Sequence, residues 1–198
     1  LEIAGNSQGK GTVLYISGEE SAEQIKMRAE RIGIAGGKIN LLTDTSLERI
    51  ESAFNAKNPE LIIVDSVQTL ISREAGNVPG TVNQIKYCCY EIIQWAKEHH
   101  AAVFFVAHVT KEGSIAGPKV IEHLVDTVCY FEHTGNELRI LRSMKNRFGS
   151  VDEIGLFSMS DKGLVQVVNP SSAFLVFRDN AIPPGIAVAS IYEGSRPF

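Results

Sequence analysis

Short apolar runs alternate with segments of helical spacing along the first part of the chain. The apolar, β-branched runs predict buried strands at Thr12–Ser17, Ile39–Leu42, Leu61–Val64 and Ala101–Val109. Between these runs, apolar residues recur every three or four positions, which predicts helices. Strands that alternate with helices indicate a mostly parallel sheet with right-handed crossovers.

Capping signals mark the starts of two of the predicted helices. Ser21 with Gln24, and Thr45 with Glu48, have the spacing of a capping box. A third and longer helix is predicted over Val82–Glu98, where apolar residues gather on one face.

The second half of the chain leaves no room for long helices. It predicts successive strands, and therefore an antiparallel extension of an α/β fold, near Thr127–Phe131, Leu138–Ser143, Glu153–Ser158, Leu164–Val168 and Ile186–Tyr192. Loops are predicted at 72–80 and 111–118, where glycine and proline occur. The Asn-Pro-Ser-Ser stretch from Asn169 predicts a domain boundary, so we expect a core over 1–168 and a linker with the start of another domain over 169–198.

Carboxylates follow two of the predicted strands. Asp65 ends the strand Leu61–Val64, and in open parallel sheets ligands bind at the carboxyl ends of strands, where an Asp could hold Mg²⁺ beside nucleotide phosphates. Glu19 or Glu20, after the first strand, could orient an attacking water as general base. The alternatives are that Asp65 favours a turn and that the glutamates favour the N-terminus of the next helix.

Basic and imidazole side chains supply further candidates. His108 ends the fourth predicted strand, where it could sense a γ-phosphate or serve a structural role. Lys111 and Lys119 lie among glycines, as a contact to a nucleic-acid backbone would require. Lys145 and Arg147 could reach phosphates on a neighbouring subunit, and the alternative is a solvated basic turn.

Composition narrows these possibilities. The 198 residues are 44% hydrophobic and 21% charged, as in a globular protein, and no apolar run is long enough to span a bilayer. The net charge of −4 argues against nucleic-acid binding over the whole surface but permits a local basic strip. The three cysteines form no C-x-x-C pair, which excludes a cysteine zinc site and favours a reducing, cytoplasmic compartment. We expect these thiols to be buried in the core.

Several motifs together resemble the RadA/Sms family of bacterial DNA-repair proteins. These motifs are VLYISGEES, AEQIKMRAERI, LIIVDSVQT, PGTVNQIK, VAHVTKEGSIAGPKVIEHLVDTV and KNRFG, the last being the hallmark of the family. The resemblance runs from about Thr12 to the end of the chain. It implies a RecA-like ATPase core that uses ATP and Mg²⁺, assembles as a hexameric ring and binds single-stranded DNA. It further implies branch migration of recombination intermediates beside a recombinase filament.

The resemblance also implies roles for individual residues. Glu19 matches the catalytic glutamate, Asp65 the Walker B aspartate and His108 the sensor position. Residues 67–81 match a first DNA-facing loop and 111–119, with Lys111 and Lys119, a second one. Lys145 and Arg147 match the motif that couples nucleotide to DNA binding across the subunit interface, and the tail from about Ser171 resembles the start of a Lon-protease-like domain.

The sequence departs from the family pattern in three ways. The zinc motif of four cysteines that the family carries near its N-terminus does not occur in the 198 residues. The phosphate-binding pattern G-x-x-x-x-G-K-[ST] does not occur either, since Gly9-Lys10-Gly11-Thr12 precedes a strand rather than a helix. The Lon-like segment stops at Phe198. The alternative function is therefore a catalytically inert binding or assembly module, and we expect the chain to have been cut from a larger protein.

Overall fold

The structure is a computed structural model that describes residues 1–7, 11–34, 39–76, 78–108, 116–133, 138–169, 192–193 and 196–197. It forms two compact units, Leu1–Leu124 and Val125–Phe198, which are described separately below. The predicted boundary after residue 168 differs from this division, because the antiparallel strands form a unit of their own. The assignment of 169–198 to a linker and a Lon-like domain falls almost wholly outside the described residues and stays a prediction.

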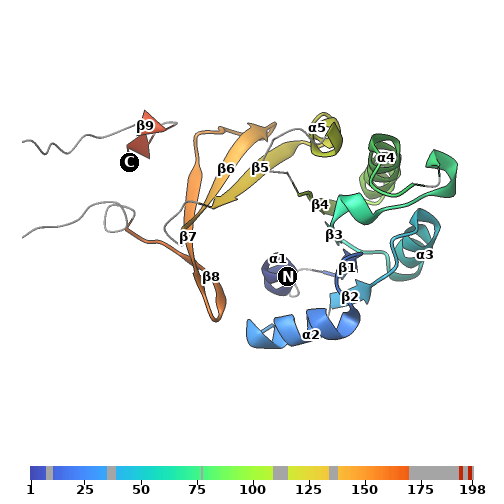
Figure 1. Cartoon of the computed structure of the whole chain (residues 1–198), viewed down its shortest axis with the longest axis horizontal. Coiled ribbons are helices and arrows are strands. Elements are labelled where there is room, and N and C mark those ends of the chain that lie inside the picture. The colour runs from blue at the N-terminus through green and yellow to red at the C-terminus, as the bar shows by residue number, and fades with distance from the viewer. Residues whose placement is uncertain are drawn as a thin grey trace, which may run out of the picture. The chain divides into compact units, whose positions relative to one another are not determined.

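The first unit contains a parallel sheet of four strands (Figure 1). The strands are β1 (Val13–Ser17), β2 (Ile39–Leu42), β3 (Leu61–Asp65) and β4 (Ala102–Val106), and their order across the sheet is β2-β1-β3-β4. All neighbouring pairs are parallel. The structure thus confirms the four predicted strands, although β4 ends earlier than the apolar run suggested.

Five helices occur among the described residues of this unit: α1 (Glu2–Ser7), α2 (Ala22–Arg31), α3 (Leu47–Lys57), α4 (Val82–Glu98) and α5 (Ala116–Glu122). Two short 3-10 turns, η1 (Val67–Thr69) and η2 (Arg73–Ala75), lie between β3 and α4. The capping box of Ser21 and Gln24 and the bounds predicted for α4 are confirmed. The loop predicted at 111–118 is wrong at its end, because α5 begins at Ala116 and takes Pro118 into its first turn, where proline costs no hydrogen bond.

The second predicted capping box is also wrong. Ser46, not Thr45, caps α3, and its hydroxyl accepts a hydrogen bond from the backbone N–H of Arg49. Thr45 is engaged elsewhere, because its carbonyl accepts a hydrogen bond from the N–H of Ile71. The extended pairing of this segment with Ile71 moves the start of the helix by one residue.

Alternate residues of the strands enter two different cores, as the period of two requires. In β1, β2 and β3, even-numbered residues such as Leu14 and Ile62 pack with α3, α4 and α5, whereas odd-numbered residues such as Tyr15 and Ile63 pack with α1 and α2. In β4 the odd-numbered residues Val103 and Phe105 pack in the core with α3, α4 and α5. The helices accordingly cover both faces of the sheet (Figure 1).

The cysteines divide between the two units. Cys88 and Cys89 are buried on α4, as predicted, and burial raises the pKa of the Cys88 thiol to about 12. Cys129 is exposed in the second unit, so the prediction of a buried thiol is wrong there. Its strand presents alternate side chains to solvent.

The second unit is an antiparallel sheet of β5 (Thr127–His133), β6 (Leu138–Asn146), β7 (Ile154–Ser160) and β8 (Gly163–Gln166), in that order. Two further short strands, β9 (Tyr192–Glu193) and β10 (Arg196–Pro197), pair with each other. The predicted antiparallel extension is confirmed, while most of the predicted strand Ile186–Tyr192 lies outside the described residues. Within the described part of the chain, no helix has both the length and the apolar character needed to cross a membrane.

Candidate functional site

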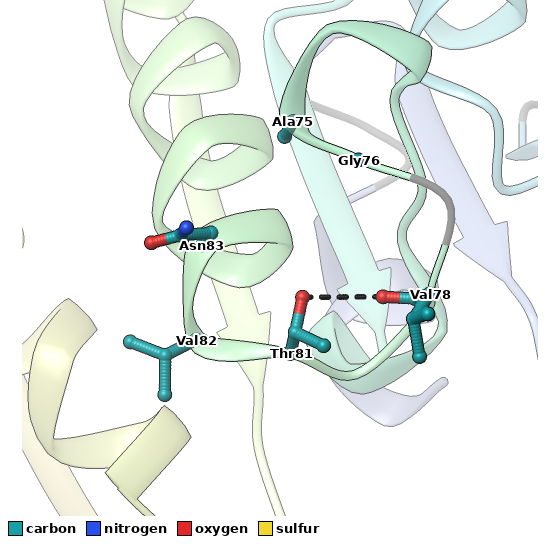
Figure 2. A pocket seen from close by; sticks show the side chains of 6 residues that line it. All are labelled: Ala75, Gly76, Val78, Thr81, Val82 and Asn83. Atoms are coloured by element: carbon teal, nitrogen blue, oxygen red, sulfur yellow. Dashed lines mark hydrogen bonds between the residues drawn. The ribbon is translucent and has the colours of Figure 1, made fainter.

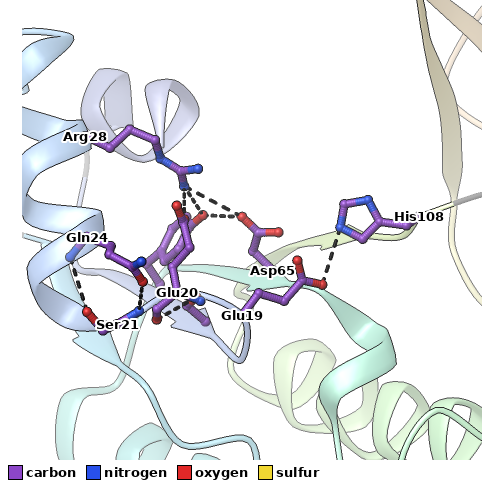
Figure 3. Close-up of polar contacts among 9 residues, drawn as sticks. Glu19, Glu20, Ser21, Gln24, Arg28, Asp65 and His108 are labelled. Carbon is purple, nitrogen blue, oxygen red and sulfur yellow. Dashed lines mark hydrogen bonds and ion pairs between the residues drawn. The ribbon is translucent and has the colours of Figure 1, made fainter.

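Three neighbouring strands bring the predicted site residues to one edge of the parallel sheet. Glu19 follows β1, Asp65 ends β3 and His108 follows β4. Because β1, β3 and β4 are adjacent and parallel, their carboxyl ends lie side by side. Figure 3 shows the three side chains at this edge. The structure therefore brings together the three residues that were predicted to be catalytic, Glu19, Asp65 and His108.

The turn after β1 is held tightly against the segment after β3. The backbone N–H of Gly18 donates a hydrogen bond to the carbonyl of Asp65 at 3.1 Å. A Cβ atom on Gly18 would lie 2.1 Å from Oγ1 of Thr69 and 2.5 Å from Cγ2 of Thr45. Glycine is required here for close packing, and this packing fixes where Glu19 leaves the strand.

The carboxylate of Glu19 is oriented by two neighbours. The buried hydroxyl of Ser66 donates a hydrogen bond to Oε1 of Glu19 at 2.5 Å. Nε2 of His108 lies 3.4 Å from the same oxygen, and the contact is an ion pair when the imidazole is protonated. The backbone at His108 is held in turn by Gln68, whose amide donates to the His108 carbonyl at 3.0 Å. Glu19 thus links the ends of β3 and β4.

Asp65 has a different set of partners on the side of the sheet covered by α2. Its Oδ2 atom accepts a hydrogen bond of 2.5 Å from the hydroxyl of Tyr15. The guanidinium of Arg28 lies 4.0 Å from this oxygen, but it pairs more closely, at 2.7 Å, with Glu20. Of the two glutamates considered as general base, Glu20 is therefore tied to Arg28, whereas Glu19 reaches toward His108 (Figure 3).

Tyr15, Arg28 and Ser66 were not predicted from the sequence. Ser66 is adjacent to Asp65, and Tyr15 lies on the same side of the sheet because Ser17, two residues later, is paired with Asp65. The positions of Ser66 and Tyr15 relative to Asp65 could therefore have been found from the sequence and the pairing of the strands. The contact of Arg28 could not be found from spacing, since it depends on how α2 crosses the sheet.

The donor set at this edge suits a magnesium ion. Mg²⁺ prefers carboxylate and water oxygens and usually keeps several waters. The side chain of Asp65 is 24% exposed and Tyr15 occupies one of its oxygens, which leaves the other for a metal or a metal-bound water. The residues present therefore fit the predicted role of Asp65 as an indirect ligand.

Lys145 and Arg147 are tied to one short segment in the second unit. Nζ of Lys145 donates to the carbonyl of Val125 at 2.7 Å. Nη1 of Arg147 lies 2.9 Å from Oδ1 of Asp126, and the backbone N–H of Arg147 donates to the Asp126 carbonyl. Phe148, which follows, is 82% exposed. The motif is thus a turn in which both cations contact the adjacent residues Val125 and Asp126, while the Arg147 side chain stays 57% exposed.

The regions predicted to face DNA are described only in part. Lys119 lies exposed on α5, while Lys111 falls outside the described residues. An open pocket of about 410 Å³ lies at the start of α4 (Figure 2). Four of its lining residues belong to the segment 67–81 that was predicted to face DNA, and two follow it. The lining residues are Ala75, Gly76, Val78, Thr81, Val82 and Asn83. The loop beside the pocket is fastened by Gln84, which is fully buried and exchanges hydrogen bonds with both backbone groups of Ser72.

A protein-family model described as an AAA domain matches residues 2–114, most of the first unit. The chain belongs to the AAA domain family. Its match covers Glu19, Asp65 and His108, so the edge described above lies wholly within the AAA domain.

Curated relatives extend the similarity over nearly the whole chain. Proteins named DNA repair protein RadA from Treponema pallidum, Rickettsia bellii and Pseudomonas aeruginosa are 50%, 48% and 42% identical over 187, 199 and 199 residues. These alignments cover 94%, 99% and 100% of this chain. They cover only 41%, 44% and 44% of the relatives, so the chain spans less than half of their length. The resemblance inferred from the motifs is confirmed.

The predicted fold class is confirmed by a solved structure. A KaiC-like protein from Pyrococcus horikoshii superposes with a TM-score of 0.63 over 83% of this chain and 80% of its own, at 15% identity. The likeness supports the RecA-like arrangement of a parallel sheet flanked by helices, with antiparallel strands after it.

The packing around Gly18 yields a prediction. We expect Gly18→Ala to lower the free energy of unfolding by about 1–3 kcal/mol, because the added methyl group overpacks the turn against Thr69 and Thr45. Chemical denaturation followed by circular dichroism measures this change. Gly149→Ala is the matched control, since its Cβ would meet only Asn146 at 3.4 Å. Equal stability of the two variants would contradict the packing argument.

Proposed function

We propose that the chain is the ATPase core of a DNA-repair motor, which hydrolyses ATP with Mg²⁺ and is stimulated by single-stranded DNA. The observation that carries the proposal is the meeting of Glu19, Asp65 and His108 at the ends of three adjacent parallel strands. The names of the RadA relatives support a role in DNA repair. We further propose that the motor promotes branch migration of recombination intermediates in the cytoplasm, beside a recombinase filament.

Each residue at the edge has a distinct task in this proposal. Glu19 orients the attacking water and accepts its proton, for which the hydrogen bond from Ser66 holds its carboxylate in place. Asp65 holds Mg²⁺ through water, and the ion would neutralise charge that develops on the phosphates. His108, in contact with Glu19, reports on the γ-phosphate to the chain segment that follows it.

Lys145 and Arg147 act in trans in the proposed assembly. The proposed homo-oligomer is a hexameric ring in which these cations reach the nucleotide of a neighbouring subunit. Lys111 and Lys119 contact the DNA backbone. In this structure Lys145 contacts Val125 and Arg147 contacts Asp126, so the proposed coupling requires these two side chains to exchange these partners for phosphates.

A second candidate function is a catalytically inert binding or assembly module. It is favoured by the absence of a G-x-x-x-x-G-K-[ST] pattern from the 198 residues and by the net charge of −4. Titration of this chain with labelled ATP and Mg²⁺ separates the two candidates. Tight, saturable binding would decide against the inert module.

The role of Glu19 gives the first functional prediction. In the full-length protein, Glu19→Gln should lower ATP turnover at saturating ATP by about 10²–10⁴-fold, because a general base usually contributes a factor of this size. Binding of ATP should persist, because the amide keeps the shape of the side chain. Glu30→Gln, on the exposed part of α2, is the matched control and should leave turnover unchanged. Full turnover in Glu19→Gln would refute the assignment.

The proposed coupling role of Lys145 gives a second functional prediction. Lys145→Ala should bring the ratio of ATP turnover with and without single-stranded DNA toward one, because the cation no longer links the two sites. Lys162→Ala, in the exposed turn between β7 and β8, removes the same charge as a control and should preserve the ratio. A normal ratio in Lys145→Ala would show that DNA stimulation does not pass through this motif.

A further inference from the structure

The contact between Tyr15 and Asp65 has a consequence for the site. We propose that Tyr15 is a positioning residue for Asp65: its buried hydroxyl engages Oδ2 of the carboxylate and so directs the remaining oxygen toward the nucleotide-bound metal. The inference rests on the proposed function of Asp65. Tyr15 itself is proposed to touch neither the metal nor the nucleotide.

The register of the sheet places the two side chains together. Ser17 is paired with Asp65 and Tyr15 with Ile63, so Tyr15 and Asp65 lie on the same face of neighbouring strands. Tyr15 is 1% exposed and packs in the core beneath α1 and α2. The surrounding core therefore holds the ring of Tyr15 in place. Its hydroxyl oxygen lies 2.5 Å from Oδ2 of Asp65.

Arg28 determines the direction of this hydrogen bond. Its Nη2 group donates to the hydroxyl oxygen of Tyr15 at 3.4 Å. Since a phenol has one proton and the arginine is a donor only, the proton of Tyr15 is left for Asp65.

Glu20 competes with Asp65 for the cation of Arg28. Nη2 of Arg28 lies 2.7 Å from Oε2 of Glu20 and 4.0 Å from Oδ2 of Asp65. The shorter contact holds the cation at the edge of α2. Asp65 thus receives a neutral, directional donor on one oxygen while the cation pairs more closely with Glu20, and a neighbouring side chain commonly orients a metal-binding carboxylate in this way.

Direct metal binding tests the proposal. The full-length protein is titrated with Mn²⁺ in the presence of a non-hydrolysable ATP analogue, and free Mn²⁺ is followed by electron paramagnetic resonance. Tyr15→Phe should weaken Mn²⁺ affinity by about tenfold, the lower end of the effect of losing such a supporting contact. The Mg²⁺ concentration that gives half-maximal ATP turnover should rise in parallel, with turnover at saturating Mg²⁺ little changed. Tyr90→Phe, which removes an exposed hydroxyl from α4, should change neither value.

A double-mutant cycle separates positioning from a merely structural role. If Tyr15 acts through Asp65, then Tyr15→Phe causes no further loss of Mn²⁺ affinity in an Asp65→Asn background. An equal loss in both backgrounds would overturn the inference, and so would unchanged affinity in Tyr15→Phe alone. If Asp65→Asn itself left Mn²⁺ affinity intact, the proposed function of Asp65 would fail instead.

A measurement on the unaltered protein covers the case in which Tyr15→Phe does not fold. Tyrosines labelled with ¹³C at Cζ are observed by NMR in the full-length protein, and Tyr15 is assigned by elimination from variants of the other tyrosines. Adding Mg²⁺ to the complex with the ATP analogue should shift the Tyr15 signal and leave that of Tyr90 in place. A Tyr15 signal that does not respond would contradict the proposal.

Discussion

Parallel pairing of β1, β3 and β4 is the constraint on which the site depends. The register joins Ser17 to Asp65 and Asp65 to Val106, so the three strands end at the same level. Residues that are far apart in the sequence then leave the sheet side by side. Glu19 and His108 meet at 3.4 Å for this reason, and no local feature of either segment would bring them together.

The alternation of side chains along each strand gives Asp65 and Glu19 different neighbours at this edge. Tyr15 and Asp65 lie on the face covered by α2, which allows Arg28 to join them. Ser66, one residue beyond Asp65, reaches Glu19 instead. The carboxylate proposed as metal ligand and the carboxylate proposed as base therefore have separate supports, and each can be altered without removing the partner of the other.

The sequence predicted those features that depend on local pattern. Periodicity located all four parallel strands and gave the bounds of α4, and strand ends indicated Glu19 or Glu20, Asp65 and His108 as candidate site residues. Competing local signals caused the errors: Thr45 and Ser46 are both good caps, and Gly117 with Pro118 is typical of loops. The hydrogen bond from Tyr15 to Asp65 and the ion pair of Arg147 with Asp126 join distant segments. Spacing alone could not fix such contacts, because they depend on register and on helix packing.

The most direct test of the account is whether a metal–nucleotide complex binds at the carboxyl edge of the parallel sheet. Mn²⁺ with a non-hydrolysable ATP analogue broadens the NMR signals of nearby nuclei, and the chain carries five histidines as reporters. If the complex binds at this edge, the ring signals of His108 broaden, while those of His99 and His100, which precede β4 at the opposite edge, stay sharp. Sharp His108 signals at saturating Mn²⁺ and analogue, or equal broadening of all three histidines, would contradict binding there.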